Sequence, residues 1–424
     1  MLNRKQSPVI VDAVHYNLEL KPYTFHSLDN GVEVYAIDAG AEEVLQLEWV
    51  YAAGNCYERQ NLIAATVNFL LRNGTSTKTA FQINEQVEYY GAYLNRSCFN
   101  EQAVVSLHCL TKHIDELLPI VRELVIDSVM PEDELQLYKQ NMKQRLSVNL
   151  RKCDFVAGRL IDTYLFGENH PYGKFSSDEA FDSLQREALL EFYERYYRQG
   201  KLILFVAGKI PHNLIEKLNR YFGDLPNGVT ELPVTPLVKA DEKKYRIQND
   251  PDGMQGAIRM ARNFPNRHHP DFIPAQLLNT VFGGFFGSRL MSNIREDKGY
   301  TYGIHSFLLN LQQESAWMIS TEAGKDVCEA TIKEVYLEME RLRTTLIDDE
   351  EMMLVRNYMM GGILGDLDGP FQLIARWKNL ILNGLNADYF YKTIDTIKHC
   401  SPEELRTLAN KYLCPEDFYE LVVI

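Results

Sequence analysis

The sequence predicts an α+β fold of two homologous domains, each a mostly antiparallel sheet with helices packed on one side. The chain has 424 residues, more than one typical hydrophobic core holds. Predicted strands come in runs that are segregated from long helices, which is typical of α+β proteins. The same element order occurs on both sides of a proline-rich segment at 225–236. We therefore expect domains at 1–224 and 243–424, joined by a linker at 225–242.

The first half begins with a turn at Asp29-Asn30-Gly31, followed by two alternating stretches that predict strands. Thr79 suits the N-cap and Gly91 the C-cap of one of the helices that follow. Pro131 suits the first position of another helix. The predicted strands are 32–37, 44–50, 92–98, 103–109 and 202–207, and the predicted helices are 60–72, 80–90, 112–130, 131–150, 155–166, 184–197 and 211–222.

The second half repeats this plan with the same kinds of pattern. A strand pair and a helix come first, a second strand pair and long helices follow, and a final strand closes the chain. The predicted strands are 244–248, 255–261, 300–309, 314–322 and 418–423, and the predicted helices are 271–282, 327–343 and 348–364, with two or three shorter ones after them. The two halves share no obvious primary-sequence repeat, so element order alone carries the inference of duplication.

Composition narrows the class of protein. The net charge of −14 argues against nucleic acid or an anionic membrane as the main partner. Seven scattered cysteines form no CxxC pair, which favours a reducing compartment over a disulfide framework or a thiolate zinc site. The first eight residues are charged without an apolar run behind them, and no stretch reaches the ~18 apolar residues of a membrane span. We expect a soluble, cytoplasmic protein.

The most informative stretch is 283–302, where a glycine-rich aromatic loop leads into a short helical turn and then a strand. Arg295 ends the helical turn, and Tyr302 starts the strand seven residues later, after a turn at Lys298 and Gly299. A cation and a phenol on two adjacent elements suit the binding of a carbonyl or a developing oxyanion. An arginine in a surface salt bridge and a tyrosine in a half-buried strand explain the same spacing.

Several segments together resemble the pitrilysin and insulinase family of zinc peptidases, which includes the subunits of the mitochondrial processing peptidase. The matching segments cover most of the chain and occur in the family's order: Leu28 to Val34 with Ala53-Gly54, Asn73-Gly74-Thr75, Val87 to Asn95, Phe166 to Gly173, and Ser288-Arg289-Leu290 followed by Arg295-Glu296, Gly299 and Tyr302. The resemblance implies a half-clamshell of two homologous domains, with two chains enclosing a chamber for peptides.

The resemblance also shows what this sequence lacks. Active members carry His-x-x-Glu-His on a helix just before the Asn-Gly-Thr segment, and the two histidines bind zinc while the glutamate activates water. Ala65, Asn68 and Phe69 stand at these three positions. The third zinc ligand, a glutamate in the family, falls near Arg145, which would repel a metal. We expect no metal or other cofactor in this chain, and no peptidase activity from it alone.

The half of the site that contacts substrate is retained. By resemblance, Arg295 and Tyr302 stabilise the peptide carbonyl, and substrate contacts come from Gly283, Gly284, Ser288 and Arg289. The expected partners are a peptide substrate and a homologous chain with His-x-x-Glu-His and zinc, in a dimer. Two alternatives stay open: a structural subunit, like the core proteins of a respiratory complex, and a peptide-binding homodimer.

Overall fold

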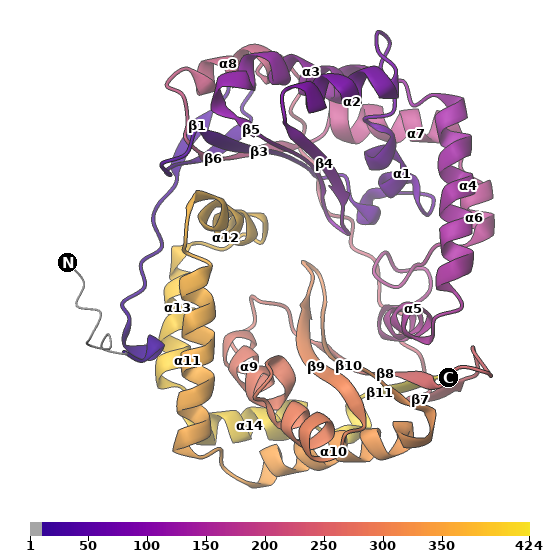
Figure 1. Ribbon diagram of the computed structural model, residues 1–424, viewed down its shortest axis with the longest axis vertical. Coiled ribbons are helices and arrows are strands. Elements are labelled where there is room, and N and C mark those ends of the chain that lie inside the picture. Colours follow the sequence, from indigo (N-terminus) through magenta and orange to yellow (C-terminus); the bar gives the residue numbers. More distant parts are fainter. Residues whose placement is uncertain (1–10) are drawn as a thin grey trace.

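The computed structural model describes residues 11–424, so the expectation for the first eight residues lies outside the described part. The chain forms a ring-shaped arrangement of two halves, with a sheet in each half (Figure 1). The first sheet has the order β1-β2-β6-β3-β5-β4, and the second has the order β7-β11-β8-β10-β9. The strands are β1 Thr24–Ser27, β2 Glu33–Asp38, β3 Val44–Tyr51, β4 Tyr93–Cys98, β5 Ala103–Leu110, β6 Leu202–Gly208, β7 Lys244–Ile247, β8 Gln255–Phe264, β9 Thr301–Asn310, β10 Ser315–Gly324 and β11 Tyr419–Val423.

The helices follow the predicted order with a few differences. In the first half they are α1 Ile63–Leu70, α2 Ala80–Tyr89, α3 Ile114–Asp127, α4 Glu132–Asn149, α5 Cys153–Phe166, α6 Asp178–Asp182, α7 Arg186–Tyr193, the π-helical turn η4 Glu194–Arg198, and α8 Leu214–Phe222. In the second half they are α9 Phe272–Asn279, the π-helical turns η5 Thr280–Gly284 and η6 Met291–Asp297, α10 Cys328–Thr344, α11 Asp349–Gly365, α12 Pro370–Leu382, α13 Ala387–His399 and α14 Pro402–Tyr412.

Local capping explains several of these boundaries. Thr79 caps α2 in a capping box with Gln82, as its position predicted. Gly91 has φ +61° just after α2, in the left-handed region that glycine adopts without strain. Pro131 is the N-cap of α4 rather than its first helical residue. α6 was not predicted, and Ser177 caps it by accepting from the backbone N–H of Ala180 at 3.1 Å.

Five strands of each sheet follow the same order and β1 is an additional edge strand of the first sheet, which confirms the predicted α+β fold of duplicated halves. β2, β6, β3, β5 and β4 of the first sheet correspond to β7, β11, β8, β10 and β9 of the second. In each sheet the only parallel pair is the matching one, β2 with β6 and β7 with β11, and the other pairs are antiparallel. The duplication that we inferred from the order of the elements is therefore correct, although the sequences of the two halves have diverged.

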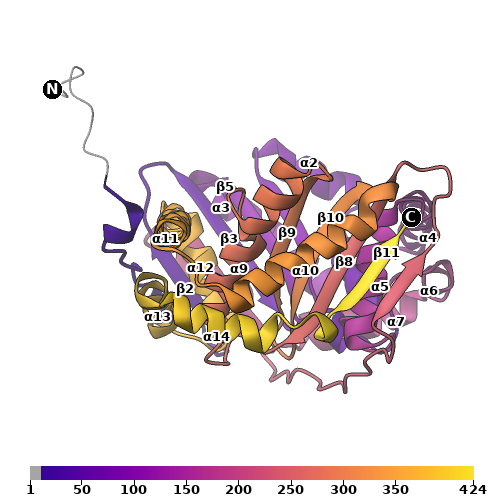
Figure 2. The ribbon, with the colours of Figure 1, turned by 90° about the horizontal axis from the view of Figure 1, so that it is seen from below.

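One helix from each half packs against the sheet of the other half. α3 and α8 cover the outer face of the first sheet, and α9, α10 and α14 lie across the outer face of the second (Figures 1 and 2). α12 packs on the other face of the first sheet, against β2 and β6, and α5 packs on the other face of the second, against β8 and β11. Each sheet thus has helices of its own half on its outer face and one helix of the opposite half over part of its other face. Two of the clusters of buried side chains accordingly contain residues from both halves.

Residues 223–243 contain no helix or strand, in agreement with the proline-rich composition of this part. This segment nevertheless pairs with α5, because the backbone N–H groups of Val238 and Ala240 donate to the carbonyls of Phe166 and Tyr164 at 3.2 and 3.1 Å. No helix within residues 11–424 is long and apolar enough to cross a membrane.

Candidate functional site

Arg295 and Tyr302 meet at the start of the edge strand β9. The guanidinium carbon of Arg295 lies 5.0 Å from the ring centroid of Tyr302 and 4.7 Å from that of Phe286. Tyr302 is 89% exposed, and its hydroxyl has no hydrogen-bond partner among the described residues. The nearest carboxylate to Arg295 is that of its exposed neighbour Glu296, at 3.3 Å. A cation and a free phenol therefore lie side by side and face solvent, at a sheet edge where a peptide can approach.

The turn between the two residues fixes their relative position. Gly299 has φ +66°, which an ordinary side chain tolerates poorly, and its N–H donates to the carbonyl of Arg295 at 3.2 Å. The N–H of Tyr300 donates to the carbonyl of Ile294 at 3.0 Å, and Ile294 is fully buried. Asn293 ties the same turn to α10 through its amide, which donates to Glu338 at 2.7 Å. The pair is therefore positioned by packed elements rather than by a mobile loop.

The other four predicted substrate-binding residues have structural contacts. A Cβ on Gly283 would lie 2.7 Å from the Cβ of Ser306, so glycine is required for η5 to approach β9. Gly284 is similarly close to the carbonyl of Asn279, at 3.2 Å. Ser288 is buried, and Arg289 forms a two-pronged ion pair with Glu351 of α11 at 2.9 and 2.7 Å. Gly283 and Gly284 thus allow the loop to pack closely and Arg289 is held by an ion pair, while the assignment of these four residues to substrate binding stays a prediction.

The three zinc-motif positions lie on α1, on the first sheet's half of the ring (Figure 1). Asn68 is buried, and its side-chain amide donates to the hydroxyl of Tyr197 at 3.1 Å. Phe69 packs against Tyr138, with ring centroids 4.8 Å apart. Ala65 offers no ligand atom at all. These residues do not fit a zinc ion, and residues 11–424 contain no group of three His, Cys, Asp or Glu side chains arranged to hold a metal.

A cation sits beside the degenerate motif, and sequence reasoning missed it. The guanidinium of Arg96 in β4 lies 5.1 Å from the ring centroid of Phe69 and donates to the backbone carbonyl of Phe69. It also reaches the side-chain oxygen of Asn73 at 3.4 Å. Burial, together with the nearby charge of Arg72, lowers the pKa of Arg96 to about 10, so it remains charged at neutral pH. Arg145, the residue near the third ligand position, is exposed on α4.

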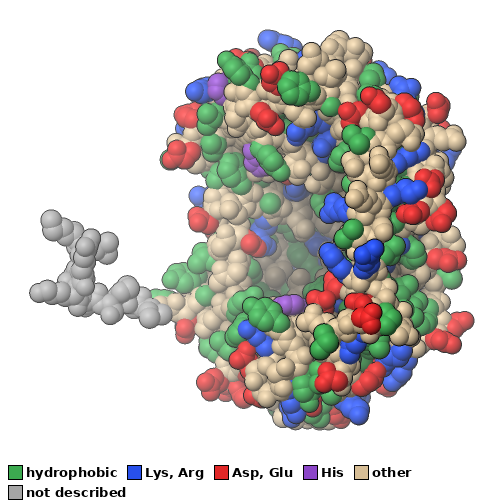
Figure 3. All heavy atoms as spheres, turned by 45° about the vertical axis from the view of Figure 1, so that its right-hand side comes forward, with side chains coloured by type: hydrophobic (Ala, Val, Ile, Leu, Met, Phe, Trp, Pro, Cys, Tyr) green, Lys and Arg blue, Asp and Glu red, His purple; other side chains and the backbone are tan. Residues whose placement is uncertain are grey.

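A space-filling view shows a hollow between the halves, with lysine and arginine side chains on its rim (Figure 3). The degenerate motif and the Arg295–Tyr302 pair belong to different halves, on α1 and at the β9 edge. From the sequence we thus predicted the contact between Arg295 and Tyr302. No sequence signal pointed to Arg96, because its contact with α1 spans 27 residues and a lone arginine in a strand is common.

Comparisons with known proteins relate this chain to zinc peptidases. Residues 183–359 match the family model described as "Peptidase M16 inactive domain". A protein of Rickettsia felis described as an uncharacterized zinc protease is 23% identical over 356 residues, which cover 81% of this chain and 83% of that protein. The beta subunit of the mitochondrial processing peptidase of Bos taurus is 24% identical over 367 residues, covering 81% of this chain and 72% of the subunit.

The fold agrees as well. A crystal structure of a peptidase M16 inactive domain from Pseudomonas fluorescens superposes with a TM-score of 0.84 at 20% identity, covering 95% of this chain and 98% of that one. This likeness concerns the fold and extends over both halves of the ring. Taken together, residues 183–359 match the peptidase M16 inactive domain, and the chain is a distant homologue of proteins described as zinc proteases and as processing-peptidase subunits, without a His-x-x-Glu-His motif of its own.

Proposed function

We propose that this chain is the non-catalytic subunit of a two-chain zinc metallopeptidase. A homologous partner with His-x-x-Glu-His supplies the zinc and the general base, and this chain closes the chamber and binds the peptide. The observation that carries the proposal is the contrast between the two half-sites. Arg295 and Tyr302 are assembled and accessible, whereas Ala65, Asn68 and Phe69 have no zinc-binding chemistry.

The role of Arg295 and Tyr302 follows from their chemistry. The guanidinium and the phenol donate hydrogen bonds to the scissile carbonyl as negative charge develops on its oxygen, and one such donor typically contributes ~3 kcal/mol to the transition state. The ring of Tyr302 and that of Phe286 flank the guanidinium, which limits its motion before substrate arrives. The peptide lies extended along a free strand edge, β9 or β4, which adds main-chain hydrogen bonds.

Reconstitution tests the proposal. The full chain is mixed with a His-x-x-Glu-His homologue from the same organism, and cleavage of a fluorogenic peptide library is followed with and without a chelator. The mixture is expected to be active, chelator-sensitive and more active than the homologue alone. Arg295→Ala and Tyr302→Phe are each expected to lower kcat/KM by about 100-fold. Tyr89→Phe is the matched control, because Tyr89 is also a highly exposed tyrosine, 82% exposed, but lies on α2.

Two results would contradict the proposal in different ways. An active mixture in which both variants match the wild type would exclude the role in trans and favour the structural-subunit alternative. Zinc-dependent cleavage by this chain alone would contradict the interpretation of residues 65–69.

A further inference from the structure

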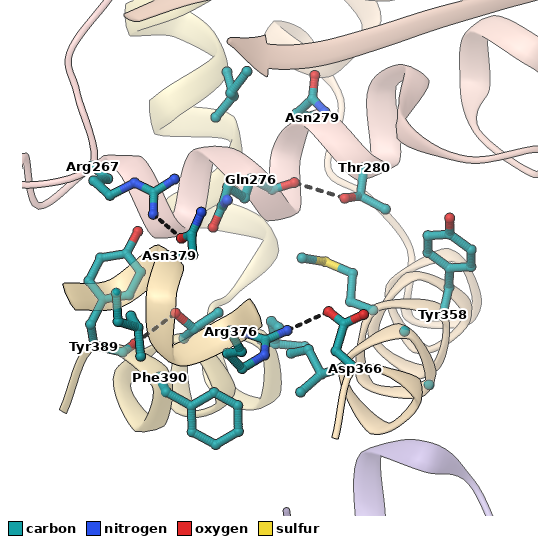
Figure 4. Close-up of a pocket in the computed structure, with 18 of the residues that line it drawn as sticks. Arg267, Gln276, Asn279, Thr280, Tyr358, Asp366, Arg376, Asn379, Tyr389 and Phe390 are labelled. Carbon is teal, nitrogen blue, oxygen red and sulfur yellow. Dashed lines mark hydrogen bonds and ion pairs between the residues drawn. The ribbon is translucent and has the colours of Figure 1, made fainter. Parts of the chain in front are cut away.

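A cavity of the described chain lies away from the Arg295–Tyr302 pair. It has a volume of about 1020 Å³ and is lined by residues of α9, α11, α12, α13 and β9 (Figure 4). Small-molecule sites in proteins usually have volumes of about 300–1,000 Å³. Neither Arg295 nor Tyr302 lines the cavity, nor does any of the zinc-motif positions. The proposed peptidase role therefore leaves this space unexplained.

Four polar side chains from four segments gather at one end of the cavity: Arg267 before α9, Gln276 on α9, Asn379 on α12 and Tyr389 on α13 (Figure 4). Arg267 donates to the side-chain oxygen of Asn379, and its Nε is buried without a partner. The amide of Gln276 and the hydroxyl of Tyr389 have no hydrogen-bond partner among residues 11–424. This end of the cavity thus offers several free hydrogen-bond donors around one cation.

Arg267 is a half-buried cation without a counter-ion in the described chain. No carboxylate of residues 11–424 forms an ion pair with its guanidinium, and burial lowers the pKa of Arg267. The second arginine of the cavity, Arg376, is by contrast paired with Asp366 at 2.5 Å. Removing part of a charge from water costs free energy unless the charge is paired, so an unpaired, half-buried guanidinium at a cavity favours an anion from outside the chain.

The wall formed by α11 keeps the cavity open. Gly361 and Gly362 both line it, and a Cβ added at either position would meet no atom within 4 Å. Packing therefore does not require glycine here, although glycine inside a helix lowers helix stability. The missing side chains leave room on the cavity side. Gly365 of the same helix has equally free surroundings but does not line the cavity.

We propose that this cavity binds a small organic carboxylate, whose anionic group pairs with Arg267 and whose apolar part lies toward Phe307 and Leu380. One uncompensated positive charge among neutral amides and a phenol matches a monoanion. A phosphate dianion would need a second free cation, and Asp366 already neutralises Arg376. The site does not depend on the proposed peptidase role, because it shares no residue with it.

The experiment measures binding of acetate, hexanoate, benzoate, benzamide and inorganic phosphate to the full chain by calorimetry and ligand-observed NMR. At least one of the three carboxylates is expected to bind saturably at one site per chain, and benzoate is expected to bind at least tenfold more tightly than its neutral analogue benzamide. Arg267→Gln and Gly362→Leu should each weaken carboxylate binding at least tenfold. Gly365→Leu adds the same side chain to the same helix outside the cavity and should leave affinity unchanged.

Circular dichroism and thermal melting accompany each variant. Arg267→Gln is expected to melt no lower than the wild type, since it removes a charge that no carboxylate of the described chain compensates. Gly362→Leu tests the same site by reducing the volume of the cavity. If one of the two variants fails to fold, the other still tests the proposal. The proposal is overturned if none of the three carboxylates binds, if phosphate binds more tightly than all of them, or if binding survives both substitutions.

Discussion

Restoring the zinc ligands in this chain should fail to restore tight zinc binding while Arg96 is present. The perturbation is the variant Ala65→His, Asn68→Glu, Phe69→His, with Arg145→Glu as third ligand, compared with the same variant carrying Arg96→Gln. Phe69→His leaves the backbone carbonyl at that position intact, and this carbonyl is what Arg96 donates to. The guanidinium is therefore expected to stay beside the introduced histidine.

The magnitude follows from the contact distance. The guanidinium carbon of Arg96 lies 5.1 Å from the ring at position 69, so a zinc ion held there would lie on the order of 5 Å from a positive charge. A doubly charged ion and a single charge at that distance repel by about 6 kcal/mol at an effective dielectric of about 20. This corresponds to about 10⁴-fold in affinity. Turning of the Arg96 side chain reduces the figure, and we expect Arg96→Gln to tighten zinc binding by at least about 100-fold.

The assay is competition against a chromogenic zinc chelator at pH 7.5, with the fold of both proteins checked by circular dichroism. Arg59→Gln in the ligand-restored background serves as a control for net charge, because Arg59 is a highly exposed arginine whose only ion pair is with Glu191 at 3.8 Å. Equal zinc affinities with and without Arg96 would refute the reasoning. Tightening by Arg59→Gln to the same extent would show that overall charge, not position, governs the effect.

Two further predictions concern stability. Gly283→Ala should destabilise the fold by about 1–3 kcal/mol in urea denaturation, because its Cβ would lie 2.7 Å from that of Ser306, whereas Gly361→Ala should be neutral or stabilising; equal effects would contradict the packing argument. Burial raises the pKa of Asp162 to about 7 despite the nearby charge of Arg259. Folding then favours the protonated acid, so stability should fall as pH rises from about 4 to 7, and Asp162→Asn should flatten that slope in urea midpoints measured across this range; an unchanged slope would show that other groups set it.

The sequence by itself determined the element order and the duplication, and the family resemblance identified Ala65, Asn68 and Phe69 as the zinc-motif positions. These features depend on local patterns: alternation, helical periodicity, capping residues such as Thr79 and the identities of residues 65–69. It also placed Arg295 and Tyr302 together, because a short turn through Gly299 is the only chain between them. Contacts between residues that are close in sequence can be predicted from such local patterns.

Only the tertiary structure showed which of the remaining polar side chains are free to bind a ligand and which are paired within the chain. Arg289 was predicted to bind substrate, but its pairing with Glu351 spans 62 residues and follows from how α11 packs. The same holds for Arg96 beside Phe69 and for Arg267 facing a cavity between four helices. The exchange of α5 and α12 between the sheets is equally invisible in local patterns. The physical reason is shared: whether a charge is free or paired depends on the partners that folding brings to it from distant parts of the chain, and periodicity records burial but not partners.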